Sequence, residues 1–300
     1  YLATLSPLPL MLASRIVEGM SHLAIVVCAP TLIAELSAQR HTGFTLTLWG
    51  TFLGVSFAAL AFGGLPFADA YGVGGLFAAH GIFLALIAVP LALRLPRIET
   101  DVPNDAFSFG TLMHRHIAIY SSPRISAAGV GWLFYATCFI SLLTLLPQFI
   151  APEVRAAVIG AMLIASIVSS LTLGVWMLRF FPATRIVETG FALSATLALT
   201  LITAPGHPAL CIALAATLGL VQGASFAAVP QLNDATEDRA TAYGAMVQTG
   251  NIGNLLGVPL LMVIIAVSGN TGAMLAASTL FFLGLFLHLW LGRRRQAVTT

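Results

Sequence analysis

The stretch RIVEGMSHL, residues 15–23, places three ionisable side chains inside a long apolar run. Arg15, Glu18 and His22 follow one another at spacings of three and four residues, so a helix would carry them along one stripe. A charge at the centre of a spanning helix costs about 2.5–3.5 kcal/mol on insertion scales, and such residues face a cavity or a partner. The stripe therefore indicates a helix that lines a polar path.

The composition of the whole chain is that of a membrane protein. Of its 300 residues, 58% are hydrophobic and 8% are charged, and the mean hydropathy is +0.96. A soluble domain carries about 25% charged residues. The net charge of +2 is too small to predict a nucleic-acid partner. Cys28, Cys138 and Cys211 stand singly in apolar runs, which predicts packing roles and neither a metal site nor a disulfide.

Nine apolar runs are long enough to cross a bilayer core, which needs roughly 20 residues per helix. They cover residues 10–33, 43–66, 73–94, 125–147, 156–178, 186–204, 209–232, 243–268 and 274–292. The sequence therefore predicts an all-α polytopic membrane protein, with residues 1–9 as the tail of another helix and a turn. We expect a first helical bundle over 1–94, a polar connecting loop over 95–124 and a second, six-helix bundle over 125–300.

The arginines are distributed unevenly over the connections between these runs. Taking alternate connections as one side, that side holds Arg40, Arg94, Arg97, Arg115, Arg124, Arg179, Arg185, Arg239, Arg293, Arg294 and Arg295. The other side holds only Arg155. Because cytoplasmic loops collect positive charge, we expect the central loop and the C-terminus to be cytoplasmic.

A faint internal repeat relates the two ends of the chain. A shift of 200 residues places Gly19 on Gly219, Pro30 on Pro230 and Gly50 on Gly250. Glycine and proline control backbone approach and helix ends, so these identities predict two copies of one bundle in the same orientation. The second copy begins near Ile125, and the matching depth of Pro30 predicts about 75 further residues, room for three helices, before Tyr1 in a twelve-helix parent.

Several motifs resemble those of the major facilitator superfamily. Arg15–Gly19 is similar to the R-x-x-x-G signature of that family's fourth helix, and APTLIAE (29–35) with TLWGTFLG (47–54) resembles the end of that helix and the fifth. VPQLND (229–234) and YGAMVQTGNIGNLLGVPLL (243–261) resemble the tenth and eleventh helices of bacterial permeases. The resemblance implies a two-bundle transporter fold, with the last three helices of the first half and all six of the second.

The fifth helix departs from the family's antiporter signature. Its Gly-Pro pair is missing, because Gly50 and Gly54 are followed by Val55 and Ser56. This departure disfavours drug/proton antiport and favours uptake or symport.

Candidate path residues lie on several of the runs. Arg15 with Glu18 is a self-neutralising pair, an arginine that extends to the nearby outer interface, or part of the translocation path, and the resemblance favours the last. His22 is either a protonatable site or a hydrogen-bonded bundle histidine. The repeat places Gln222 opposite His22, as a midplane solute ligand or an interhelical hydrogen bond. Tyr135, at i+3 from Trp132, is a further candidate, with packing as the alternative.

The segment VQTGNIGN combines amides and glycines. Gln248, Asn251 and Asn254 recur at three-residue spacing and either line the cavity or hydrogen-bond neighbouring helices. We expect close helix contacts and gating at the small and helix-bending residues, which are Gly19, Gly50, Gly54, Gly250, Gly253, Gly257, Pro30 and Pro230. His80 and His288 fall on helices that resemble peripheral ones, so structural roles are expected there.

These patterns predict a monomeric secondary transporter in the cytoplasmic membrane of a bacterium. It would move a small solute across the lipid bilayer by alternating access, with a small organic anion as the preferred class, without a cofactor and with a proton gradient as a candidate driving force. A polytopic membrane enzyme is the alternative, although GASFA (223–227) and AHG (79–81) lack the order and spacing of intramembrane-protease motifs. A channel fits a two-copy bundle with a long central loop poorly.

Overall fold

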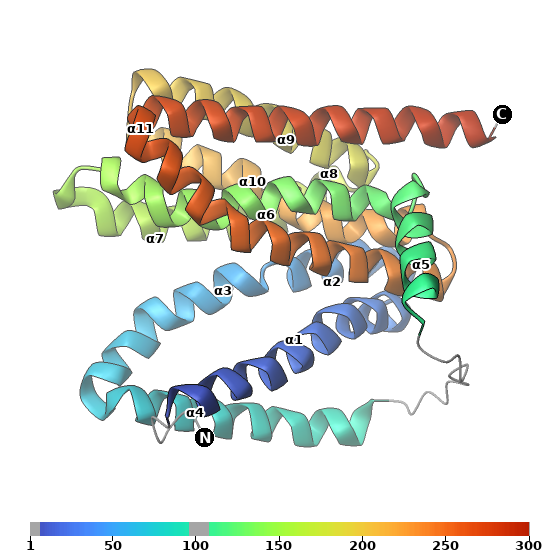
Figure 1. Ribbon diagram of the computed structural model, residues 1–300, viewed down its shortest axis with the longest axis horizontal. Coiled ribbons are helices and arrows are strands. Elements are labelled where there is room, and N and C mark those ends of the chain that lie inside the picture. The colour runs from blue at the N-terminus through green and yellow to red at the C-terminus, as the bar shows by residue number, and fades with distance from the viewer. Residues whose placement is uncertain (1–6, 96–107, 300) are drawn as a thin grey trace. The chain divides into compact units, whose positions relative to one another are not determined.

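Helices account for nearly all of residues 7–95 and 108–299, which are the residues that the computed structural model describes. Their bounds are α1 Leu8–Leu36, α2 Gln39–Gly50, α3 Phe52–Ala59, η2 Leu60–Gly64, α4 Leu65–Arg94, α5 Phe109–Ser121, α6 Ser126–Leu145, η3 Leu146–Phe149, α7 Pro152–Ser169, η4 Ser170–Gly174, α8 Val175–Met177, α9 Ala183–Thr203, α10 Pro208–Leu232 and α11 Thr236–Thr299 (Figure 1). Residues 1–6 of the predicted helix tail lie outside the described residues.

Seven stretches of the described residues are long and apolar enough to cross a membrane. Two of them, Gly54–Arg94 and Thr236–Ala297, are 41 and 62 residues long, which is about twice the length that a bilayer requires. Each contains one glycine with a positive φ, Gly72 at 77° and Gly269 at 57°, where residues with a Cβ are strained. Both glycines lie between runs that the sequence predicts as separate helices, and α11 folds back on itself in Figure 1.

The central connection contains a helix that the sequence pattern left unassigned. Within 95–124 the structure forms α5, whose apolar residues Leu112, Met113 and Ile117 recur at helical spacing. The remaining part of the predicted loop, residues 96–107, lies outside the described residues. A short amphipathic helix has too few apolar residues to be distinguished from a loop by hydropathy.

The chain divides into two compact units. Unit 1 comprises residues 1–23 and 56–115, and unit 2 comprises residues 24–55 and 116–300. These bounds differ from the predicted division at residues 94 and 125, because residues 24–55 pack with the later helices. The predicted domain bounds remain a prediction about the bundles of the family.

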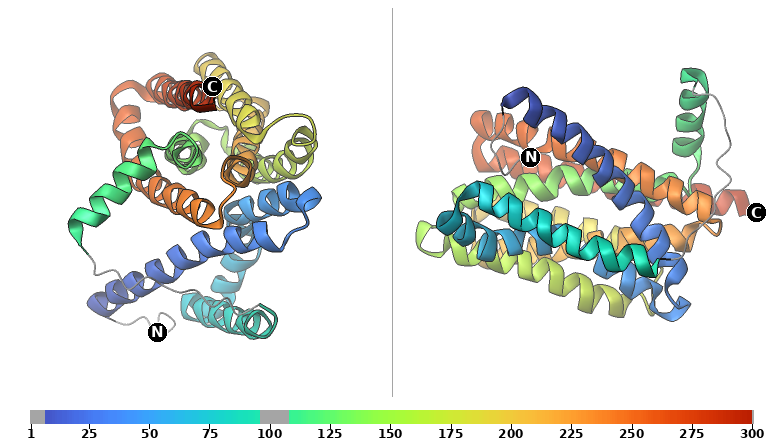
Figure 2. Two further views of the ribbon diagram at one scale, coloured as in Figure 1. Left: turned by 90° about the vertical axis from the view of Figure 1, so that its right-hand side faces the viewer. Right: turned by 90° about the horizontal axis from the view of Figure 1, so that it is seen from below.

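Helix α10 is the centre of unit 2. It contacts α2, α6, α7 and α9, whose ribbons can be followed around it in Figure 2. Residues 221–229 are buried without interruption. The two arms of α11 pack against α6 and α9. Small residues make this packing close: a Cβ on Gly190 of α9 would lie 2.6 Å from the Val221 side chain.

Unit 1 contributes a helix with little protein around it. None of the residues of α4 is buried, and Leu86 and Leu93 are 68% and 78% exposed. A water-exposed helix of this composition would be unfavourable, whereas in a bilayer the same side chains contact lipid.

Candidate functional site

An ion pair on α1 opens into a pocket of unit 1. Arg15 Nη2 contacts Glu18 Oε2 one helical turn away, and the two side chains are 46% and 58% exposed. The pair lines a pocket of about 750 Å³ together with Ser14, Ser21 and, from α4, His80. Arginine and glutamate side chains accessible from a polar pocket can bind a charged solute or exchange one partner for it.

The histidine that lines this pocket is His80, whereas the sequence pattern favours His22. His22 is exposed but is not among the residues that line it. His80, expected in a structural role on a peripheral helix, lines the wall that α4 provides. A lone histidine in an apolar run carries no periodic signal, so the sequence could not select one over the other.

Gln222 is buried where α10 meets α2. Its side chain is 2% exposed, and Nε2 donates a hydrogen bond to the backbone carbonyl of Gly50. The approach depends on Gly50, because a Cβ there would lie 3.0 Å from the Phe226 ring. The amide is thus engaged in an interhelical hydrogen bond in this conformation of the protein.

Two buried hydroxyls lie beside Gly223, the residue that follows Gln222. A Cβ on the adjacent Gly223 would meet the Ser170 hydroxyl, and would lie 2.6 Å from Thr47 Cγ2. Neither Thr47 Oγ1 nor Ser170 Oγ has a hydrogen-bond partner among the described residues. The sequence pattern missed both, since single Thr and Ser residues are common in membrane helices.

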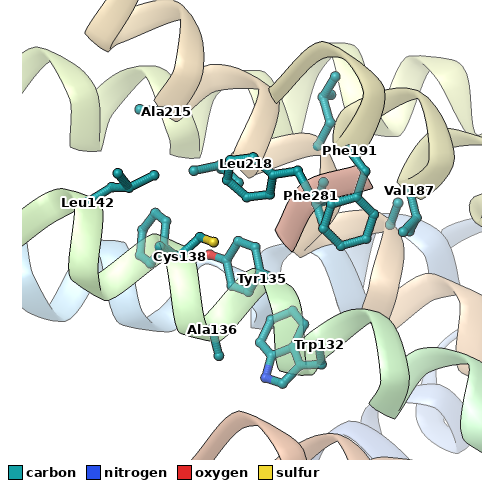
Figure 3. Close-up of a cluster of buried hydrophobic side chains, with 14 of the residues drawn as sticks. Trp132, Tyr135, Ala136, Cys138, Leu142, Val187, Phe191, Ala215, Leu218 and Phe281 are labelled. Atoms are coloured by element: carbon teal, nitrogen blue, oxygen red, sulfur yellow. The ribbon is translucent and has the colours of Figure 1, made fainter. Parts of the chain in front are cut away.

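Aromatic side chains of α6 and α10 continue this buried region. Trp132 and Tyr135 project from α6 (Figure 3), and their ring centroids are 4.6 Å apart. Phe226 of α10 meets the Trp132 ring edge-on, with the ring centroids 5.0 Å apart. Tyr135 is 1% exposed, and its hydroxyl has no partner among the residues described. A buried hydroxyl without a partner costs about 1–3 kcal/mol, so this group is available to a polar ligand.

Gln248 belongs to a different environment. Its Oε1 accepts a hydrogen bond of 2.7 Å from the Tyr120 hydroxyl, and its Nε2 lies 3.0 Å from His116 Nε2. Burial raises the pKa of Tyr120, so the hydroxyl stays protonated and able to donate. The amide thereby ties α5 to α11. Asn251 and Asn254 are exposed and form no hydrogen bond with described residues.

The glycines of α11 face α6 at close range. A Cβ on Gly250 would lie 2.7 Å from the Trp132 ring, one on Gly253 would lie 2.8 Å from the Leu133 carbonyl, and one on Gly257 would overlap the Thr137 carbonyl. A Cβ on Gly54 would lie 3.1 Å from Cγ1 of the Ile167 side chain. Gly19 faces open space within the described residues.

A second polar pocket lies at the C-terminal end of α10, and Pro230 is one of its lining residues. Its volume is about 510 Å³, and its lining includes Ser37, Gln39, Gln231, Asp234 and Arg239.

Pro30, the residue that the repeat pairs with Pro230, is buried within α1. In the described part of the chain, no three His, Cys, Asp or Glu side chains are arranged to hold a metal ion.

Residues 1–247 match the sequence profile of the Major Facilitator Superfamily. The chain belongs to this superfamily. Its members are transporters and not enzymes, so the chain is an integral membrane transporter protein, whose partners are the lipid bilayer and a small solute. The family resemblance in the sequence is therefore confirmed.

Solved structures of superfamily transporters share the fold. The fucose:proton symporter FucP of E. coli is 15% identical, with a TM-score of 0.67 over 89% of this chain and 73% of that one. The human organic anion transporter MFSD10 (TETRAN) is 16% identical, with a TM-score of 0.75 over 92% of this chain and 70% of that one. At these identities the likeness concerns the fold alone. Comparison with curated proteins gave no match.

Proposed function

We propose that the chain moves a small solute by alternating access between two helical bundles. In this proposal its nine spanning segments, with α4 and α11 divided at Gly72 and Gly269, correspond to helices four to twelve of the superfamily. Residues 1–94 and 125–300 then belong to different bundles, connected by residues 95–124. The glycine breaks within the two longest apolar stretches support this assignment.

The Arg15–Glu18 pair is the observation on which the proposal rests. A guanidinium and a carboxylate that are both accessible from a pocket of about 750 Å³ offer a solute two charged groups at once. A bound anion would compete with Glu18 for Arg15. His80 on α4 and His22 on α1 are the candidate residues for coupling to a proton gradient.

In unit 2 we assign the path to the region around Gln222 and Tyr135. Both are buried polar side chains, and the Tyr135 hydroxyl lacks a partner among the described residues. The Gln222 to Gly50 hydrogen bond joins α10 to α2, two helices that the proposal assigns to different bundles. Rocking of the bundles would break this bond and expose both groups to the solute. The exposed amides of Gln248, Asn251 and Asn254 would then lie at the edge of the path.

For the solute we propose a small organic anion bound by Arg15. A second candidate, a neutral polyhydroxylated solute carried with protons, is favoured by one observation: Glu18 neutralises Arg15, so the pair has no net charge. The two similar structures are named as transporters of one solute of each class, an organic anion and fucose. We further propose a monomer in a bacterial cytoplasmic membrane, with the central loop and the C-terminus cytoplasmic.

Uptake in bacterial cells that express the complete reading frame containing this chain tests the proposal. Labelled lactate, succinate and fucose represent the two solute classes. Arg15→Ala should abolish carboxylate uptake, because a lost charge-assisted contact of about 1.5–3 kcal/mol weakens binding by at least tenfold. Arg179→Ala, an exposed arginine outside the pocket, is the matched control at equal membrane expression.

Three results separate the candidates. Carboxylate uptake lost in Arg15→Ala alone supports the anion. Proton-dependent fucose uptake without carboxylate uptake favours the neutral solute. Unchanged uptake in Arg15→Ala contradicts the assignment of Arg15 to the path.

A further inference from the structure

Five arginines from distant parts of the sequence gather at one end of unit 2. Arg124 precedes α6, Arg185 lies in the first turn of α9, and Arg293–Arg295 lie near the end of α11. Arg295 Nη1 donates a hydrogen bond of 2.9 Å to the Pro123 carbonyl, which places the end of α11 against the start of α6. Figure 1 shows these helix ends at the same end of the unit. We call these five residues the basic cluster.

One carboxylate lies inside the basic cluster. Glu188 is 10% exposed and forms an ion pair of 3.0 Å with Arg185. Glu188 and Arg124 are the charged neighbours that act on Arg295. Five arginines and one glutamate leave a net charge of +4 in a small region, whereas the net charge of the whole chain is +2. Among the described residues of the cluster, the arginines therefore outnumber the carboxylate five to one.

The outermost arginines are placed at the end of an apolar stripe. Arg294 lies over the Trp290 ring with its Cζ 5.0 Å from the centroid. Arg293 is exposed and forms no hydrogen bond or ion pair with described residues. Phe282, Phe286 and Leu289 precede Arg293 at spacings of four, three and four, so they share its helix face. They are 47%, 62% and 39% exposed.

We propose that the basic cluster binds the phosphate headgroup of an anionic phospholipid whose acyl chains lie along this stripe of α11. Arginine forms charge-assisted, frequently bidentate hydrogen bonds with phosphate oxygens. Tryptophan is enriched at the depth of the headgroups, which agrees with Trp290 beside Arg294. Clusters of arginine next to a spanning helix attract anionic lipids electrostatically.

The same arginines could bind free phosphate, but the stripe favours a lipid. A soluble anion gains nothing from exposed phenylalanine side chains, whereas an acyl chain contacts them along the helix. Lipid binding would connect α6, α9 and α11 at one end of unit 2, because their arginines would share one headgroup.

Native mass spectrometry of the purified chain in detergent tests the proposal. Dioleoyl-phosphatidylglycerol and dioleoyl-phosphatidylcholine are the probes, since they have the same acyl chains and differ in net charge. The wild-type chain should bind phosphatidylglycerol more tightly. Arg293→Gln with Arg294→Gln should lose about 25-fold in that affinity, because each arginine near an anionic surface contributes about fivefold. Arg293→Lys with Arg294→Lys should retain most of it, since the charge remains.

The matched control is Arg40→Gln with Arg179→Gln, which removes the same charge from two exposed arginines outside the basic cluster. It should keep the wild-type affinity. Equal binding of the two lipids by the wild type, or equal losses in the two glutamine variants, would overturn the proposal. Displacement of phosphatidylglycerol by millimolar inorganic phosphate would do so as well, because it would indicate a soluble-anion site. The measurement does not depend on transport.

Discussion

Two regions of the protein place polar residues within apolar runs: the Arg15–Glu18 pocket of unit 1 and the buried region around Gln222 in unit 2. In the first, the polar groups are about half exposed and pair one turn apart on a single helix. In the second, the amide is 2% exposed and its partner is 172 residues away. Sequence spacing predicts the first contact, whereas the second depends on how two helices pack.

The difference also concerns what each region can do without rearrangement. The walls of the Arg15 pocket include accessible charged groups, so in our proposal a solute would reach them without a rearrangement of the helices. Gln222, Thr47 and Ser170 are buried, so a solute reaches them only after α2 and α10 separate. In the proposed alternating-access cycle, the two regions would therefore act at different stages.

The largest effect is expected from a glycine in the close contact of unit 2. Gly257→Leu should lower the stability by about 3 kcal/mol, because the new side chain would overlap the Thr137 carbonyl of α6. Gly19→Leu should change it by less than about 0.5 kcal/mol, since a Cβ there meets open space. Thermal unfolding in detergent, followed by circular dichroism, measures both. Equal shifts would remove the contrast between the two regions.

A smaller effect is expected at the α2–α10 contact. Gln222→Leu keeps the approximate volume but removes the hydrogen bond to Gly50, which should cost about 1 kcal/mol. Asn251→Leu is the control, because Asn251 is an exposed amide on a spanning helix. The same unfolding assay applies. A larger loss in Asn251→Leu than in Gln222→Leu would mean that the exposed amides hold the bundle together.

The smallest effect on stability is expected at Tyr135. Tyr135→Phe removes a buried hydroxyl without a partner among the described residues, so the unfolding midpoint should stay unchanged or rise by the equivalent of about 0.5 kcal/mol. If the hydroxyl binds the solute, stabilisation of the chain by that solute should nevertheless decrease in this variant. A clear loss of stability in Tyr135→Phe without solute would assign the hydroxyl a structural partner.

Most of the fold follows from local composition. A bilayer requires long apolar segments with internally satisfied backbones, so single stretches such as 186–204 predict their helix almost to its ends, Ala183–Thr203 in the structure. The breaks at Gly72 and Gly269 also fall where the apolar runs are interrupted. Helix α5 was missed, because a charged amphipathic segment resembles a loop in hydropathy.

The candidate site was less predictable. The spacing of Arg15 and Glu18 alone predicts their pair. For Gln248 the spacing leaves open both cavity lining and a hydrogen bond to a neighbouring helix, and in the structure its hydrogen bonds go to Tyr120 and His116 of α5. Its assignment to the translocation path remains a prediction. Thr47 and Ser170 gave no signal, because a hydroxyl becomes significant only when packing removes its partners.

By itself the sequence determined the membrane class of this protein, its family and the approximate positions of its long apolar helices, because a spanning helix and a short motif depend on neighbouring residues. Only the tertiary structure decided that Gln222 bonds to Gly50, that Gly257 faces α6 and that Arg295 of α11 bonds to Pro123 just before α6. Such contacts join residues more than 100 positions apart, so they exist only once the helices have packed.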